Sequence, residues 1–108
     1  MKIFVDIDET ICYNTNTEEN KTKPRDYRLS EPIRKNIESV NKLYDEGHEI
    51  TYWTARGTGS GIDWTEVTKQ QFEKWGVKYH ELKFGKPIYD LFIDDKNIST
   101  MEWEKGNL

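Results

Sequence analysis

The chain has 108 residues, of which 33% are charged and 34% hydrophobic, and its formal net charge is −4. This length suits one domain, while four Trp and six Tyr argue against a disordered chain. The acidic balance, without a dense Lys/Arg stripe, excludes a dedicated nucleic-acid module. No long apolar segment predicts a signal peptide or membrane helix, so we expect a cytoplasmic protein that binds neither nucleic acid nor membrane.

The first half of the chain predicts a strand, a long loop and a helix. Residues 2–7 form a short apolar run rich in β-formers, which is typical of a strand buried on both faces. Residues 13–29 are polar and contain several turn formers, so we expect a flap-like loop. Ser30 is expected to cap a helix that Gly47 ends. Its buried stripe would be Ile33, Ile37, Val40 and Tyr44, with Leu43 alongside.

The second half predicts another strand, loop and helix, followed by two short strands. Residues 49–53 make the strand, and the glycine-rich loop at 55–63 follows it. The helix is expected to end at Gly76, with strands at 77–82 and 89–93 after it. A capping box of Asp63 and Glu66 would begin this helix, and its buried stripe would be Trp64, Val67, Gln71 and Trp75, with Phe72 beside them.

Alternation of strands with helices predicts an α/β domain with a parallel sheet covered by helices. In open parallel sheets, ligands bind beyond the carboxyl ends of the strands. Conspicuous polar side chains follow the ends of three predicted strands, so we expect them to meet in one crevice. They are Asp6 and Asp8, Thr54 and Arg56, and Asp94 and Asp95.

Four of these side chains are carboxylates, and they would repel one another at a buried edge unless a cation lay among them. A set of oxygen ligands without His or thiolate selects a hard ion, most plausibly Mg²⁺. Asp6 as a metal ligand would stay ionised and could act as a nucleophile. Asp8 could reach a leaving oxygen and then an attacking water, as acid and afterwards as base.

The remaining polar residues could neutralise a transferred phosphoryl group. Thr54 offers a hydroxyl, and either Lys86 or Lys83 offers a fixed positive charge. Backbone amides near Asp8 and Glu9 would add further donors. Together these groups predict a phosphate-binding site.

Four motifs, in order and spanning residues 3–95, resemble those of the haloacid dehalogenase-like superfamily in its phosphatase branch. The motifs are "DIDET" at 6–10, "EITYWT" at 49–54, "GKP" at 85–87 and "LFIDD" at 91–95. The resemblance implies a Rossmann-like α/β/α sandwich of three layers without a cap domain. It also implies Mg²⁺-dependent hydrolysis of a phosphomonoester through an aspartyl-phosphate.

The resemblance also implies residue roles. Asp6 would be the nucleophile and Asp8 the general acid/base, while Thr54 and Lys86 would bind the phosphoryl group. The ligands of Mg²⁺ would be the carboxylates of Asp6 and Asp94, the backbone carbonyl of Asp8 and, directly or through water, Asp95. Thr10 would support the loop after the nucleophile. Glu9 stands where many members have Gly, which bears on substrate preference.

The spacing of "GKPIYDLFIDDK" resembles that of small phosphatases associated with capsule and surface-polysaccharide genes. We therefore expect a small phosphorylated metabolite as substrate: a sugar, polyol or amino-alcohol phosphate. Capless members often complete or shield their site by forming oligomers, or they act on large substrates, and a homo-oligomer is one of these two expectations.

The loop "ARGTGSGIDW" is the expected specificity element. Arg56 is expected either to hold a second anionic or hydroxylated part of the substrate or to pair with a surface carboxylate. Gly57 and its neighbouring glycines would let the backbone approach the substrate. Trp64 would either contact the substrate or belong to the core at the start of the helix.

Two other functions are compatible with parts of this pattern. A phospho-accepting receiver domain is also small and α/β, but it needs an acidic pair at the first strand and an Asp near mid-chain. This chain has its adjacent pair at Asp94–Asp95 instead. A catalytically inactive scaffold on the phosphatase fold would lack Asp6 or Asp8, and both are present.

Overall fold

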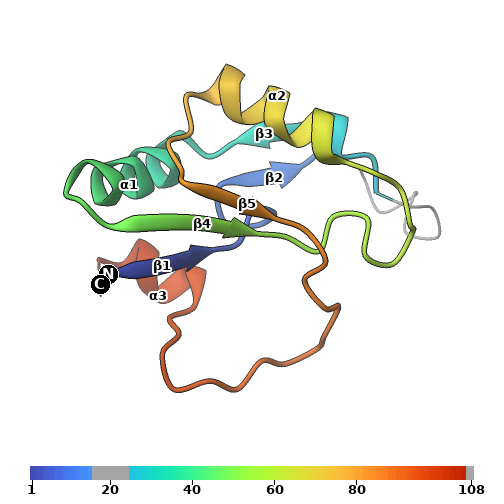
Figure 1. Cartoon of the computed structure of the whole chain (residues 1–108). Coiled ribbons are helices and arrows are strands. Elements are labelled where there is room, and N and C mark those ends of the chain that lie inside the picture. Colours follow the sequence, from blue (N-terminus) through green and yellow to red (C-terminus); the bar gives the residue numbers. More distant parts are fainter. Residues whose placement is uncertain (16–24, 107–108) are drawn as a thin grey trace.

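A parallel sheet of three short strands forms the centre of the computed structural model, which describes residues 1–15 and 25–106 (Figure 1). Its order is β1-β4-β5, and the central strand β4 buries residues on both faces. The sheet confirms the predicted α/β class and the expected strands at the N-terminus and at 49–53, but the N-terminal strand is exposed at Lys2 and Phe4 and is therefore not buried on both faces as expected. The bounds are Lys2–Val5 for β1, Glu49–Trp53 for β4 and Glu81–Lys83 for β5.

Helices α1 (Arg34–Asp45) and α2 (Thr65–Trp75) supply most of the helical side chains in the core. Both are followed by the expected glycine with positive φ, Gly47 and Gly76. In the view of Figure 1, the short helix α3 (Thr100–Glu104) lies below the sheet, and α2 lies above it. No helix within the described residues is long and apolar enough to cross a bilayer.

The hydrophobic core joins the sheet to the helices. Tyr52 of β4 contacts the ring of Phe72 edge-on, with ring centroids 4.9 Å apart. The buried stripe of α2 contains Thr68, whereas Val67 was expected there. Val67 is only partly buried. The largest apolar contributors are Ile7, Ile11, Ile37, Val40, Ile50, Tyr52, Phe72 and Trp75.

A second, two-stranded sheet corrects the predicted start of the first helix. Strands β2 (Cys12–Asn14) and β3 (Ser30–Pro32) pair antiparallel. Ser30 therefore lies in a strand and does not cap α1, whose first residue follows Ile33. The Ile33 amide donates to the Ile11 carbonyl at 2.8 Å, so the backbone of this segment is committed to pairing before the helix begins.

The flap expected at 13–29 falls partly outside the described residues, which omit 16–24. Its described parts include the end of β2 and the 3₁₀ helix η2 (Tyr27–Leu29). Asp26 caps η2 by accepting a hydrogen bond from the Arg28 amide at 3.0 Å. These ends are therefore ordered by local hydrogen bonds and by the β2–β3 pairing.

The predicted strand at 89–93 does not form in the single chain, and this is the main disagreement with the sequence prediction. Leu91 is 75% exposed and Ile93 is 88% exposed. Figure 1 shows the segment after β5 running away from the sheet before it returns to α3. No strand among the described residues pairs with it, so its apolar side chains have no sheet face to cover. The strand expected at 77–82 is shorter and begins at Glu81.

Candidate active site

A tight turn directly after β1 carries the first acidic motif. The amides of Thr10 and Ile11 donate to the Ile7 carbonyl at 3.2 and 2.9 Å, and the Glu9 amide donates to the Cys12 carbonyl at 2.8 Å. This turn holds Glu9 at φ 64°, the left-handed region in which a residue with Cβ is disfavoured by about 1–2 kcal/mol. The turn itself therefore explains why glycine suits this position, and the Glu9 side chain points to solvent as an exposed group.

Asp6 is a partly buried carboxylate at the end of β1. Its Oδ1 accepts a hydrogen bond from the Ile7 amide at 2.9 Å and lies 3.7 Å from Nζ of Lys86. Burial raises the pKa of Asp6 above 3.8, although the positive charge of Lys86 acts in the opposite direction. A poorly solvated carboxylate beside a fixed ammonium group is a suitable nucleophile for an anionic phosphoryl group.

Thr54 and Lys86 are tied together at the ends of the neighbouring strands. The Lys86 amide donates to the Thr54 carbonyl at 3.1 Å, which fixes the segment after β5 against the end of β4. The Thr54 hydroxyl is buried and accepts from the Arg56 amide at 3.1 Å. Lys83 is directed elsewhere, with Nζ 4.0 Å from Glu81 and 5.8 Å from the centre of the Phe4 ring. Lys86 is thus the lysine that the fold brings to Asp6.

Asp8 is held by a bidentate ion pair with Arg56. The Nε atom of Arg56 donates to Oδ2 and its NH2 group donates to Oδ1, both at 3.1 Å. The arginine side chain is fully buried, and 15% of the Asp8 side chain is exposed. Cys12 Sγ also contacts Asp8 Oδ1 at 3.5 Å. This arrangement fixes the direction of the carboxylate that the sequence predicts as acid/base.

The remaining donors of Arg56 also have partners within the protein. Its NH1 group donates to Thr68 Oγ1 at 2.9 Å and to Gln71 Oε1 at 2.7 Å. The guanidinium lies 4.7 Å from the centre of the Tyr27 ring, a cation–π distance. Arg56 therefore pairs with a carboxylate, but its partner is Asp8 of the candidate site and not the surface carboxylate that was expected. Substrate contact by its guanidinium does not fit, because no donor is directed to solvent.

Sequence reasoning missed the residues that hold Arg56. Gln71 bridges Arg56 to the Tyr27 carbonyl, to which its Nε2 donates at 2.6 Å. A signal was present, because Gln71 stood as a polar residue within a stripe predicted to be buried. Thr68 and Tyr27 gave no such signal, since the helix register and the loop path decide their positions.

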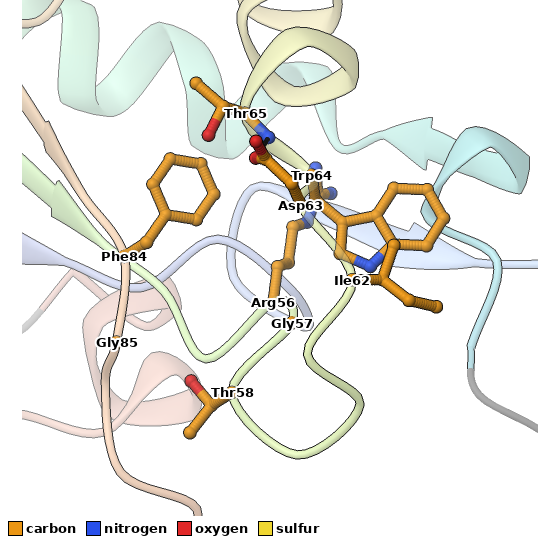
Figure 2. Close-up of a pocket in the computed structure, with 9 residues that line it drawn as sticks. All are labelled: Arg56, Gly57, Thr58, Ile62, Asp63, Trp64, Thr65, Phe84 and Gly85. Carbon is orange, nitrogen blue, oxygen red and sulfur yellow. Dashed lines mark hydrogen bonds between the residues drawn. The ribbon is translucent and has the colours of Figure 1, made fainter.

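A small pocket of about 210 Å³ lies beside this ion pair (Figure 2). In the view, Phe84 and Trp64 lie on opposite sides of Arg56. Gly57 has φ 81°, and a Cβ there would approach the Ile62 carbonyl oxygen to 2.2 Å, so the loop requires glycine at this point. The lining residues are Arg56, Gly57, Thr58, Ile62, Asp63, Trp64, Thr65, Phe84 and Gly85.

Two residues singled out in the sequence, Trp64 and Thr10, have structural roles in the chain. Trp64 is 8% exposed and packs edge-on against Tyr27, with ring centroids 5.1 Å apart, although it also lines the pocket. Thr10 is buried, and its hydroxyl lies 2.9 Å from the hydroxyl of Thr100 in α3. Thr10 therefore links the turn after β1 to α3.

The chain by itself does not gather the predicted ligands of Mg²⁺. Asp94 and Asp95 are exposed in the segment that leaves the sheet. The described residues contain no group of three or more His, Cys, Asp or Glu side chains placed to hold a metal. The reason is the absent strand at 89–93, since that strand was expected to deliver both aspartates to the end of β1.

Comparison with known proteins supports the fold. The chain is similar to a crystal structure of a Vibrio cholerae protein, named only as an MCSG target, with 28% sequence identity and a TM-score of 0.74. The match covers 95% of this chain and 87% of that chain. No family model matches the chain, and no curated protein matches it. The comparison agrees with an α/β fold and names no activity.

Proposed function

We propose that the chain is a phosphomonoester hydrolase of the haloacid dehalogenase-like type, built on a Rossmann-like α/β/α sandwich. The proposal rests chiefly on one observation: Oδ1 of Asp6 lies 3.7 Å from Nζ of Lys86 at the end of β1. Thr54, at the end of the adjacent strand, is tied to the same lysine through its backbone carbonyl. A nucleophile, a fixed positive charge and a hydroxyl-bearing strand end are what transfer of a phosphoryl group requires.

In the proposed reaction, a carboxylate oxygen of Asp6 attacks phosphorus, and the bond from phosphorus to the leaving oxygen breaks. Asp8 gives a proton to that oxygen, which departs as an alcohol. Asp8 then takes a proton from water, whose oxygen attacks the phosphorus of the aspartyl-phosphate. The bond from phosphorus to the Asp6 oxygen breaks, which regenerates the carboxylate and releases inorganic phosphate. Lys86 neutralises negative charge on the phosphoryl oxygens throughout.

Asp8 must change its contacts to take part in these proton transfers. Both of its oxygens accept hydrogen bonds from Arg56, so neither oxygen is directed away from the guanidinium toward a leaving group in the observed arrangement. A rotation of the Asp8 side chain that keeps one bond to Arg56 would release one oxygen toward the leaving group. Arg56 is therefore a positioning residue in this proposal.

The proposed substrate is a small phosphorylated metabolite, such as a sugar, polyol or amino-alcohol phosphate of surface-polysaccharide synthesis. The pocket of about 210 Å³ adjoins the proposed site through Arg56 and Gly85, and Asp6, Asp8, Thr54 and Lys86 are not among its lining residues. Phe84 offers an apolar wall and Thr58 a hydroxyl, a combination that suits a polyhydroxylated molecule with one carbon face.

Dependence on Mg²⁺ tests the proposed class of reaction. We expect phosphate release from small phosphate esters in the presence of Mg²⁺, its loss in excess EDTA, and its recovery when Mg²⁺ is added back. The measurement is inorganic phosphate released from a panel of phosphorylated metabolites. Full turnover in EDTA would contradict the metal requirement, and no release from any ester would contradict the hydrolase proposal.

Asp8→Asn is expected to slow the chemical step by about 10²–10⁴-fold, because the amide cannot carry the proton. The amide oxygen still accepts a bond from Arg56, but the buried guanidinium loses its counter-charge, so we also expect a lower free energy of unfolding, which urea unfolding of the variant measures. Single-turnover phosphate release at saturating Mg²⁺ measures the step, and Mg²⁺ titration of the same variant measures metal affinity. A collapse of metal affinity with an unchanged rate per bound metal would exclude the acid/base role.

A further inference from the structure

One edge of the main sheet is open. β1 pairs with β4, and no described strand lies along its other side. Lys2 and Phe4 are exposed on this edge strand, and Phe4 is 57% exposed. An unpaired strand edge presents free backbone donors and acceptors and is a template for another strand.

Residues 88–95, here called the arm, are a second unsatisfied feature. Leu91 is 75% exposed and Ile93 is 88% exposed, and the run 88–93 contains one charged residue, Asp90. A contiguous apolar run of this kind resembles a strand buried on both faces and not a solvated loop. The composition of the arm is therefore that of a central strand, although the arm belongs to no sheet among the described residues.

Both ends of the arm are fixed to the body of the chain. Before it, the Lys86 carbonyl accepts from the Thr58 hydroxyl at 2.9 Å. After it, Thr100 lies against Thr10 at 2.9 Å between their hydroxyl oxygens. The arm runs outward between these two points (Figure 1). It is presented to the surroundings as an extended loop that a partner can cover.

The sequences of the arm and β1 match when they run parallel with Asp94 level with Asp6. Lys2 then stands opposite Asp90, which brings unlike charges together at the start of the pair. Phe4 stands opposite Phe92, both of them now exposed, at 57% and 51%. Between and after these pairs, apolar residues face apolar residues: Ile3 with Leu91, and Val5 with Ile93.

We propose that the arm adds as a parallel strand to the open edge of β1 in a second copy of this chain, and that the exchange is reciprocal. Two copies related by a two-fold axis would close both open edges and cover both arms. The chain's own arm projects away from its own β1, which favours the second copy as occupant. The dimer would then have two sheets, each with a strand supplied by the other copy.

The exchange would also complete the active site, a consequence that rests on the proposed function. Each site would combine Asp6 and Asp8 of one copy with Asp94 and Asp95 of the other. This sharing accounts for a single chain that carries all four acidic residues without bringing them together. The site is incomplete without the second copy.

Interchain disulfide formation tests the exchange without reference to activity. A chain carrying Lys2→Cys and a chain carrying Asp90→Cys are unfolded, mixed and then refolded together. Neighbouring strands lie about 4.8 Å apart, which is within the Cα separations that a disulfide spans. We expect a covalent heterodimer by mass spectrometry and a dimer by sedimentation of the unmodified protein.

Two comparisons make this result decisive. Asp45→Cys, on the exposed end of α1, replaces Asp90→Cys as the matched control and should give no heterodimer. A chain with both Lys2→Cys and Asp90→Cys should link between chains. An internal link in that double variant, without a heterodimer in the mixture, would mean that the arm covers its own β1 and would overturn the exchange. The absence of any link would overturn it as well.

Complementation separates the exchange from the proposed function. Asp6→Asn chains and Asp94→Asn/Asp95→Asn chains should each be inactive alone. Refolded together, half of the dimers contain one intact site, so about a quarter of wild-type turnover should return. A silent mixture beside an active wild type would overturn the exchange. If the wild type itself has no activity, the hydrolase proposal fails and the disulfide result alone decides the exchange.

Discussion

Asp6→Asn is expected to abolish phosphate release, with a loss on the order of 10⁴-fold or more. The amide has nearly the shape of the carboxylate and can still accept the hydrogen bond of the Ile7 amide, which is 2.9 Å away. It cannot act as the attacking oxygen anion. Phosphate release is measured with whichever ester the wild type hydrolyses fastest.

Although Asp6→Asn should abolish activity, it should raise the free energy of unfolding at neutral pH. Because the pKa of Asp6 is raised in the folded state above 3.8, chiefly by burial, the ionised carboxylate costs free energy of folding. This cost is absent below the unfolded-state pKa and fully present above the raised folded-state pKa. The stability of Asp6→Asn relative to wild type should therefore increase as pH rises from below 4 to neutrality.

Urea unfolding of both proteins at pH 3.5 and pH 7 measures this difference. Asp45→Asn is the matched control, since Asp45 is exposed on α1 in an ion pair with Lys78. It should retain full turnover. An Asp6→Asn variant that turns over like wild type would exclude Asp6 as the nucleophile, whatever its stability.

Arg56→Ala is expected to lower the free energy of unfolding by about 3–5 kcal/mol, because it removes one partner of a buried ion pair. The substitution leaves Asp8 without its bidentate donor. It also removes the hydrogen bonds to Thr68 and Gln71, and a fully buried side chain leaves a cavity behind it. The loss is measured by urea or guanidinium unfolding of the whole chain.

The matched control is Arg28→Ala. Arg28 also makes two hydrogen bonds to one carboxylate, that of Asp26, but its side chain is 71% exposed. Solvent screening should make that loss much smaller than the loss in Arg56→Ala. A double-mutant cycle of Arg56→Ala with Asp8→Asn isolates the coupling between the pair. Equal small losses in both arginine variants would show that burial does not strengthen the Arg56 pair.

The features that the sequence predicted well are those fixed by local patterns. The apolar run before Asp6 and the run at 49–53 became β1 and β4. Gly47 and Gly76 follow the two long helices because a left-handed residue there needs no Cβ. Of the polar residues expected to meet at strand ends, Asp8 and Arg56 are in contact, because the parallel strands β1 and β4 end at the same edge of the sheet.

The features that the sequence did not predict depend on partners distant in the chain. Ser30 has the properties of a helix cap, yet its segment pairs with Cys12–Asn14, and that competition is invisible locally. Arg56 could serve substrate or protein until the direction of Asp8 was known. The arm has a strand-like sequence, but a strand also needs an edge, and the chain's own fold does not bring one to it.

The buried position of Cys12 has a practical consequence for handling the protein. Burial, followed by the nearby negative charge of Asp8, raises the pKa of this thiol to about 12. At neutral pH almost none of it is thiolate, the form that reacts with peroxide, disulfides and alkylating reagents. A group that touches both Asp8 and Arg56 is therefore protected from oxidative damage. We expect the Cys12 thiol to stay reduced in air without added reductant. Thiol-reactive labels should therefore modify only cysteines that are introduced elsewhere.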